Sequence, residues 1–142
     1  MQQERKILFI EPPFYRLSKD TYSLDRYPLS LGYLAAVVRQ KTDWDLMVYN
    51  ADFSLHSEPI EVGYLAGAGF DRYLNNLKDL SAPIWKEVKA TISEYRPTAV
   101  GISAKSQNFT SASIVAQLAK EIDEKIMVII GGPHPSMVGA EV

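Results

Sequence analysis

The sequence predicts an α/β fold in which a parallel β-sheet is covered on both faces by helices. Two observations lead to this prediction: short, mostly continuous apolar runs, and amphipathic helical patterns between them. Continuous apolar runs are typical of parallel strands that are buried on both faces. Alternation of strands and helices predicts right-handed βαβ units in three layers. The length of 142 residues fits one ordinary domain.

Four apolar segments are predicted to form the strands. They span residues 7–10, 46–49, 99–102 and 126–130. Polar or turn-forming residues bound each segment, and three of the four are continuous rather than alternating. We therefore expect helices on both sides of the sheet.

Helical patterns lie between these strands, with apolar residues at i, i+3, i+4 and i+7 spacing. Pro28 fits the first turn of the first helix, and Ser81 is predicted to cap another helix that has Pro83 in its first turn. Segment 52–69 shows the least periodicity, and we expect an irregular insertion there. The predicted apolar faces consist of Leu31, Leu34, Ala35, Val38, Phe70, Tyr73, Leu74, Leu77, Trp85, Val88, Ile92, Tyr95, Val115, Leu118, Ala119 and Ile122.

Composition excludes several classes of function. The chain has no cysteine, which removes disulfides, thiolate zinc sites and iron–sulfur clusters from these residues. A formal net charge of −2 argues against nonspecific nucleic-acid binding, which needs clustered Lys and Arg. No run approaches the ~20 apolar residues of a membrane span, and no signal peptide is evident. We therefore expect a cytoplasmic protein without a membrane span.

The fourth predicted strand lies close to the end of the sequence. It runs into Gly131-Gly132-Pro133-His134-Pro135-Ser136, after which six residues remain. Because open doubly wound sheets usually have more strands, we expect a further helix and a fifth strand beyond residue 142. The alternative is a four-stranded module whose exposed edge pairs with a second copy, giving an edge-strand dimer.

Ligands of open parallel sheets bind beyond the carboxyl ends of the strands, where three loops of this chain would meet. The first loop spans residues 11–27. Loops longer than about 12–15 residues that have no secondary structure are usually functional or disordered. This loop carries Pro12, Pro13, Phe14 and Tyr15, whose rings can form an apolar wall for a flat ligand. Simple packing of these side chains against the helices explains them equally well.

The second loop follows the third predicted strand and is small and polar. Ser103, Ala104, Ser106 and Gln107 precede a helix start, where hydroxyl and backbone N–H groups suit a phosphate or a ribose. Helix capping by Asn108 would explain part of this composition.

The third loop begins with Gly131 and Gly132, which permit positive φ and a close approach of a ligand to the backbone. Pro133 and His134 follow. A structural or solvated role is favoured for His134, since no second histidine or carboxylate stands at metal-ligand spacing from it. No catalytic residue and no metal ligand is predicted in this chain.

Four segments in this order resemble the cobalamin-binding domain that precedes the catalytic barrel in class B radical SAM enzymes. The segments are Ile7-Leu8-Phe9-Ile10-Glu11-Pro12-Pro13, Tyr27-Pro28-Leu29-Ser30-Leu31-Gly32-Tyr33-Leu34-Ala35, Arg96-Pro97-Thr98-Ala99-Val100-Gly101-Ile102-Ser103 and Ile130-Gly131-Gly132-Pro133-His134-Pro135. The second departs from the family at Ser30, where glycine is common. The resemblance covers nearly the whole chain.

This resemblance implies a Rossmann-like, flavodoxin-like sheet with strand order 2-1-3-4 and a fifth strand downstream. It also implies that the nucleotide tail of cobalamin passes between the third and fourth strands. Ser103 and Ser106 would contact the tail, and Gly131 and Gly132 would let it approach the backbone. The expected cofactor-binding set is Pro12, Pro13, Phe14, Tyr15, Ser103, Ala104, Ser106, Gln107, Gly131, Gly132, Pro133 and His134.

The stretch after the first strand indicates whether a protein histidine can bind the cobalt. Many cobalamin domains outside the radical SAM group have Asp-x-His-x-x-Gly here, and that histidine binds cobalt. This chain has Glu11-Pro12-Pro13-Phe14-Tyr15-Arg16, without a histidine. We therefore expect base-off cobalamin with no protein histidine on cobalt and with Phe14 or Tyr15 covering that face.

By the same resemblance, residues 1–142 are an N-terminal cobalamin-binding domain that lacks catalytic activity alone. A radical SAM domain would follow in the same polypeptide and hold a 4Fe-4S cluster and S-adenosylmethionine. The full protein would be a methyltransferase or an enzyme like the anaerobic magnesium-protoporphyrin IX monomethyl ester cyclase. The alternative is a stand-alone binding or sensory module of the same fold without cobalamin. A flavin carrier is less favoured, because prolines after the first strand offer no N–H to a phosphate.

Overall fold

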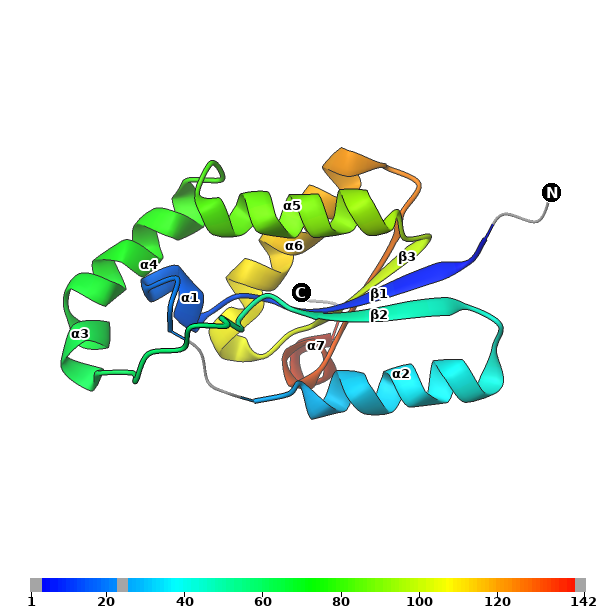
Figure 1. The fold of residues 1–142 in the computed structure, drawn as a ribbon, viewed down its shortest axis with the longest axis horizontal. Coiled ribbons are helices and arrows are strands. Elements are labelled where there is room, and N and C mark those ends of the chain that lie inside the picture. Colours follow the sequence, from blue (N-terminus) through cyan, green and yellow to red (C-terminus); the bar gives the residue numbers. More distant parts are fainter. Residues whose placement is uncertain (1–3, 23–25, 140–142) are drawn as a thin grey trace.

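A computed structural model describes residues 4–22 and 26–139. The strands in these ranges are β1 (Lys6–Glu11), β2 (Asp45–Asn50), β3 (Ala99–Ser103) and β4 (Met127–Gly131). The helices are α1 (Tyr15–Ser18), α2 (Leu29–Lys41), α3 (Val62–Ala66), α4 (Ala68–Lys78), α5 (Pro83–Tyr95), α6 (Phe109–Ile122) and α7 (Pro133–Val138), with a 3-10 turn η1 (Ser106–Asn108). Strands and helices alternate as the sequence predicts (Figure 1).

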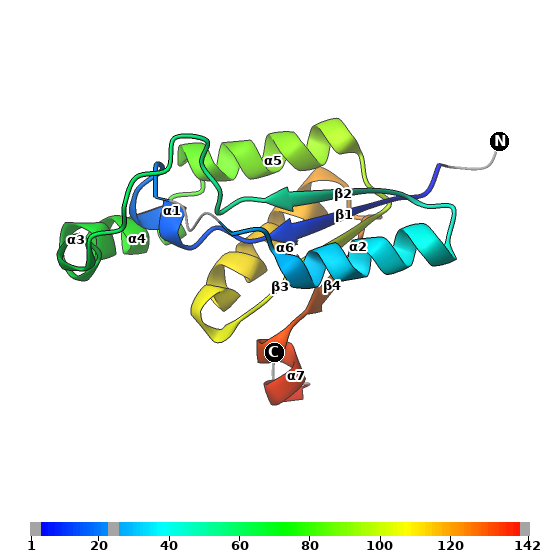
Figure 2. The ribbon, with the colours of Figure 1, turned by 60° about the horizontal axis from the view of Figure 1, so that its bottom comes forward.

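The four strands form one parallel sheet in the order β2-β1-β3-β4. In the central strand β1, Ile7 lies opposite Leu46 of β2 and Ala99 of β3. Helices α5 and α2 lie on opposite sides of the sheet (Figure 2). The predicted α/β class and flavodoxin-like order are therefore confirmed, and the carboxyl ends of all strands point to one edge.

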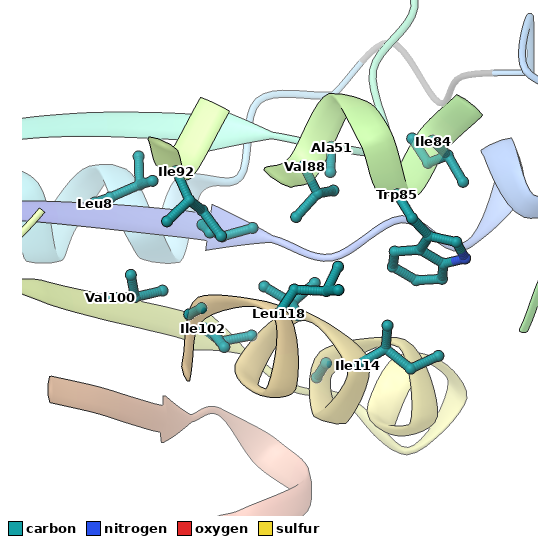
Figure 3. Close-up of a cluster of buried hydrophobic side chains, with 14 of the residues drawn as sticks. Leu8, Ala51, Ile84, Trp85, Val88, Ile92, Val100, Ile102, Ile114 and Leu118 are labelled. Carbon is teal, nitrogen blue, oxygen red and sulfur yellow. The ribbon is translucent and has the colours of Figure 1, made fainter. Parts of the chain in front are cut away.

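The larger core lies between the sheet and helices α5 and α6. Leu8 of β1 and Val100 of β3 are fully buried there (Figure 3). Ile10 of β1 belongs to the same buried cluster. Trp85 of α5 is fully buried as well, and its Nε1 donates a hydrogen bond to the backbone oxygen of Asn76 at 2.7 Å. The indole thus contributes its apolar surface without leaving a buried donor unpaired.

A smaller core lies between the sheet and helix α2. Ile7 and Phe9 of β1 pack with Leu31 and Ala35 of this helix. The ring of Phe9 also covers Gly101 of β3, where a Cβ would lie only 2.8 Å from Phe9 Cδ1. The two cores thus use alternate residues of β1, as the two faces of a strand require.

Strand β4 is buried on one face only. Val128 and Ile130 pack against the larger core, whereas Met127 is 57% exposed and Ile129 49% exposed. The prediction of a strand covered on both faces is therefore wrong for β4. Helix α2 packs mainly on β1 and β2, so it leaves this part of the sheet open. Leu34 of α2 is 52% exposed, so its predicted place on the buried face of this helix is wrong.

The N-cap of helix α5 lies one residue later than the predicted cap Ser81. Ala82 occupies the N-cap position, and Pro83 is the first helical residue. Ser81 Oγ instead donates to Asp79 Oδ1 at 2.6 Å. The prediction of Ser81 as the N-cap is therefore wrong, because the nearby carboxylate takes its hydroxyl.

Helices α3 and α4 extend past the carboxyl ends of β1 and β2, where α4 contacts α1 (Figure 1). Helix α3 lies within the segment predicted to be irregular. On α4, Tyr73 and Leu77 pack against the larger core, whereas Phe70 and Leu74 are exposed. None of the helices in the described ranges is long and apolar enough to cross a membrane.

Candidate functional site

A crevice of about 410 Å³ lies at the carboxyl edge of the sheet, between the ends of β1 and β3 and the start of α2. The chain leaves β1 toward β2 and leaves β3 toward β4, so these neighbours form the switch point of the sheet. Open parallel sheets bind ligands at this place. The lining residues are Glu11, Pro12, Phe14, Tyr15, Arg26, Tyr27, Pro28, Leu29, Ser30, Asn50, Asp52, Lys105, Gln107 and Asn108.

An ion pair joins the two strand ends at this crevice. Lys105 Nζ lies 2.8 Å from Glu11 Oε1. The side chain of Glu11 is 13% exposed, and that of Lys105 is 48% exposed. One partner is therefore fixed at the end of β1, while the ammonium group of the other is accessible to a ligand.

The loop after β1 supplies two aromatic rings to the crevice. Phe14 and Tyr15 pack edge to face with their ring centroids 5.0 Å apart, and Phe14 packs in the same way on Tyr73 of α4 at 5.6 Å. Pro13 is buried and does not line the crevice. Its backbone oxygen accepts a 2.6 Å hydrogen bond from Ser111 Oγ, which fastens the loop to α6.

The loop after β3 supplies polar groups. Asn108 is buried, and its Oδ1 accepts a hydrogen bond from the backbone N–H of Lys105 at 2.7 Å. Asn108 also lines the crevice. The side chain of Gln107 is exposed beside it. These groups can donate hydrogen bonds to carbonyl oxygens of a ligand.

The remaining predicted site residues lie at the junction of β3 and β4. Ser103 and Ala104 are buried, while Gly131, Gly132 and Pro133 are exposed. The backbone N–H of Ala104 donates to the oxygen of Gly131 at 2.7 Å. The space between the third and fourth strands, where the resemblance places the nucleotide tail, is thus bridged by backbone hydrogen bonds.

Gly132 is required at this junction by its conformation. Its φ is +113°, and a Cβ there would lie 2.6 Å from the backbone oxygen of Ala104. His134 closes the junction, because its N–H donates to the same oxygen at 3.2 Å and its Nδ1 lies 3.1 Å from Ser106 Oγ. The His134 ring also packs on Phe109, with centroids 4.3 Å apart. Apart from the buried Pro13, the structure therefore divides the predicted set into two groups. The crevice group is Pro12, Phe14, Tyr15 and Gln107, and the junction group is Ser103, Ala104, Ser106, Gly131, Gly132, Pro133 and His134.

Asp52 is a site residue that the sequence reasoning missed. It follows β2, and its Oδ1 accepts hydrogen bonds from the backbone N–H groups of Phe14 at 2.9 Å and Arg16 at 3.0 Å. Burial, with a smaller effect of the nearby Glu11, raises the pKa of Asp52 to about 6 despite the opposing effect of these donors. Its place directly beyond the second strand was the signal that could have identified it.

Arg16 anchors the same loop through its side chain. Its guanidinium donates to Glu87 of α5 through two hydrogen bonds of 2.9 and 3.0 Å, and to the backbone oxygen of Ala51 at 3.0 Å. Tyr49 Oη also donates to Glu87, at 2.5 Å. Burial and this bond raise the pKa of Tyr49, whereas the bonds from Arg16 and Tyr49 outweigh burial and lower the pKa of Glu87.

A second cavity of about 730 Å³ adjoins the crevice along the outer side of β2. The two share Arg26, Tyr27, Pro28 and Asn50 in their walls. Asn50 Nδ2 donates to the backbone oxygen of Arg26 at 3.2 Å, a contact between the end of β2 and the segment before α2. Within residues 4–22 and 26–139, no three His, Asp or Glu side chains are placed to hold a metal ion.

The B12 binding domain family matches residues 16–142. The chain belongs to this B12-binding family. An uncharacterized methyltransferase of Pyrococcus horikoshii is 28% identical over 129 residues, which cover 91% of this chain and 22% of that protein. The chain thus spans about a fifth of the length of this curated relative. No solved structure matches the chain significantly.

The residues at the sheet edge fit a corrinoid. A corrin ring is flat and carries amide side chains around its rim. The aromatic pair Phe14–Tyr15 offers it an apolar surface, and Lys105, Gln107 and Asn108 offer donors to amide oxygens. Membership of the family implies cobalamin binding, and the crevice is the place in this structure that provides both kinds of contact.

Proposed function

We propose that this chain holds a corrinoid over the carboxyl edge of its sheet and presents it to a catalytic domain. The observation that carries this proposal is the crevice at the switch point, found in a chain of the B12-binding family. When bound, the corrinoid would supply a cobalt centre that can carry a methyl group. The chain itself would contribute binding and orientation, not a catalytic residue.

Each part of the site would have a distinct task. Phe14 and Tyr15 would cover one face of the ring and exclude water from it. Lys105, Gln107 and Asn108 would donate hydrogen bonds to the amide rim. The junction group, with Ser103, Ala104, Ser106, Gly131, Gly132, Pro133 and His134, would contact the nucleotide tail once the two loops separate.

The cobalt face would lack a protein histidine. The segment from Glu11 to Arg16 contains none, and His134 is held at the junction by Ser106 and Phe109. We infer a base-off corrinoid whose lower face meets aromatic side chains. Electron paramagnetic resonance of the reduced complex should show no nitrogen splitting from a histidine. Such splitting would overturn the inference.

The catalytic partner would be a radical SAM domain in the same polypeptide. It would hold the 4Fe-4S cluster and S-adenosylmethionine, since the 142 residues contain no cysteine for a cluster. A methyltransferase fits the similarity to the Pyrococcus horikoshii protein better than the cyclase alternative does. A sequence of the gene that continues into a Cys-x-x-x-Cys-x-x-Cys motif would support this arrangement.

One observation favours a second candidate, a binding module of this fold that has lost the cofactor. The backbone hydrogen bonds from Ala104 to Gly131 and from His134 to Ala104 close the space between β3 and β4. A nucleotide tail can enter there only if these bonds open. A cofactor-free module would keep them permanently.

Hydroxocobalamin added to the purified protein distinguishes the two candidates. The proposal predicts that cobalamin stays with the protein through gel filtration and that its visible spectrum shifts to the base-off form. Loss of all cobalamin at high micromolar protein, in a chain extended to include any downstream strand, would contradict the proposal and support the cofactor-free module.

A further inference from the structure

Asp52 stands out in the crevice as a carboxyl group without a cation partner. It is half-buried and lines the crevice together with the aromatic pair. Within the described ranges, no lysine or arginine forms an ion pair with it. Its charge is therefore stabilised by backbone N–H groups, which do not fully offset its removal from water.

The position of this carboxyl is fixed from both sides. Oδ1 accepts the two N–H groups of Phe14 and Arg16, and the N–H of Asp52 itself donates to Asn50 Oδ1 at 3.0 Å. A helix as short as α1 does not form alone, so these contacts hold the loop that carries Phe14 and Tyr15. Asp52 therefore lies directly beneath the surface on which the corrinoid would rest.

The charged and titratable groups around Asp52 do not offset its charge. Glu11 of β1 is a second carboxylate nearby, and Lys105 is already paired with it. The guanidinium of Arg16 is directed to Glu87 and to the oxygen of Ala51. The groups that face the crevice from the surrounding elements are Glu11, Tyr15, Arg26, Tyr27 and Lys105, with Arg16 behind the loop.

A ligand that covers the crevice would remove the remaining water from Asp52. Desolvation favours the neutral form of a carboxyl group, and within the described ranges no lysine or arginine forms an ion pair with Asp52 that would oppose this. A neutral carboxyl group retains an oxygen that accepts the loop N–H groups and gains an O–H that can donate to an amide oxygen. Binding would therefore favour the protonated form.

We propose that Asp52 takes up a proton when the corrinoid covers the crevice, so that affinity for the corrinoid increases as the pH falls. This inference rests on the proposed function and names a regulation of the same site. Asp52 would act there as a contact and positioning residue, since it both touches the ligand and holds the aromatic loop.

The dissociation constant for hydroxocobalamin, measured between pH 5 and pH 8, tests the coupling. If binding raises the pKa of Asp52 by one unit above its free value of about 6, affinity at pH 8 is about tenfold weaker than at pH 5. Asp52→Asn imitates the neutral form and keeps an accepting oxygen. This variant should bind at pH 8 about as tightly as the wild type binds at pH 5, with little dependence on pH.

Asp71→Asn is the matched control, because Asp71 is an exposed aspartate of α4 outside the crevice. It should keep the wild-type pH profile. The ratio of the wild-type dissociation constant to that of the variant at each pH cancels the effect of the ionisation of hydroxocobalamin itself. A wild-type pH profile in Asp52→Asn would overturn the inference, because another group would then titrate.

A second measurement needs no ligand and no variant. The carboxyl carbon of Asp52, followed by NMR in the free protein, should titrate with a midpoint near 6. A midpoint near 4 would overturn the inference even if cobalamin binds. Failure of the wild type to bind cobalamin at any pH, with the midpoint near 6, would instead contradict the proposed function.

Discussion

Lys105 Nζ lies 2.8 Å from Glu11 Oε1 and so connects the loop after β3 to the end of β1. The two residues are 94 positions apart in the sequence, yet they meet at the switch point of the sheet. Both residues line the crevice, and the half-exposed ammonium group of Lys105 can turn toward a ligand there.

Replacement of Lys105 should weaken cobalamin binding with little effect on the stability of the fold. Lys105→Ala removes a donor to the corrinoid rim, and we expect about fivefold to tenfold weaker hydroxocobalamin binding by equilibrium titration. The free energy of unfolding should change by less than about 1 kcal/mol, because the half-exposed ammonium group leaves the ion pair in contact with water. Lys125→Ala, an exposed lysine in the turn between α6 and β4, should change neither quantity. Unchanged cobalamin binding in Lys105→Ala would contradict the role assigned to Lys105.

The two adjacent glycines after β4 should respond very differently to a side chain. Gly132→Ala places a Cβ 2.6 Å from the backbone oxygen of Ala104 in a residue with φ of +113°, whereas a Cβ at Gly131 meets no atom within 4 Å. We expect Gly132→Ala to lower the free energy of unfolding by about 1–3 kcal/mol and Gly131→Ala to change it by less than about 0.5 kcal/mol. Urea denaturation measures both. Equal effects at the two positions would show that the junction is not as tight as described.

Arginine at position 16 should not be replaceable by lysine. Arg16 makes paired hydrogen bonds to Glu87 and a third to the oxygen of Ala51, and the single ammonium of lysine cannot reproduce this geometry. Because Glu87 is partly exposed, we expect Arg16→Lys to cost only about 1–2 kcal/mol of unfolding free energy. Arg39→Lys on the exposed side of α2 is the control and should cost almost nothing. A similar loss in both variants would contradict the anchoring role of Arg16.

The sequence predicts the sheet well because its signals there are local. The apolar runs at 7–10, 46–49, 99–102 and 126–130 fall within β1 to β4, apart from Ile126 at the start of the last run. Parallel topology then places Phe14, Tyr15 and Gln107 at one edge, and the structure finds them in one crevice. Which strand pairs with which came from the family resemblance, since periodicity does not encode strand order.

Two of the errors, at Leu34 and Asp52, depend on how distant parts of the chain pack, whereas the error at Ser81 is local. Leu34 has the correct spacing for a core residue, but periodicity cannot show whether another element covers its side of α2, and the residue is exposed. Asp52 was missed because its partners, Phe14 and Arg16, are 38 and 36 residues away. Ser81 was assigned as a cap by its residue type alone, whereas the position of Asp79 decides its bonding.

The raised pKa of Asp52 predicts an unusual dependence of stability on pH. A carboxyl whose pKa is about 6 in the folded state, above its usual value near 3.8, binds its proton more tightly when the protein is folded. Its contribution to stability is therefore complete below about pH 4 and is lost as the pH rises through 6. Most paired carboxylates show the opposite trend.

The comparison of Asp52→Asn with wild type isolates this contribution from that of other groups. The asparagine keeps an oxygen for the N–H groups of Phe14 and Arg16 but has no charge to bury. At pH 7 we expect the variant to be about 1–2 kcal/mol more stable than wild type in urea denaturation, and at pH 4 the difference should shrink toward zero. A variant that is less stable than wild type at pH 7 would show instead that the ionised carboxylate is the form that the fold prefers.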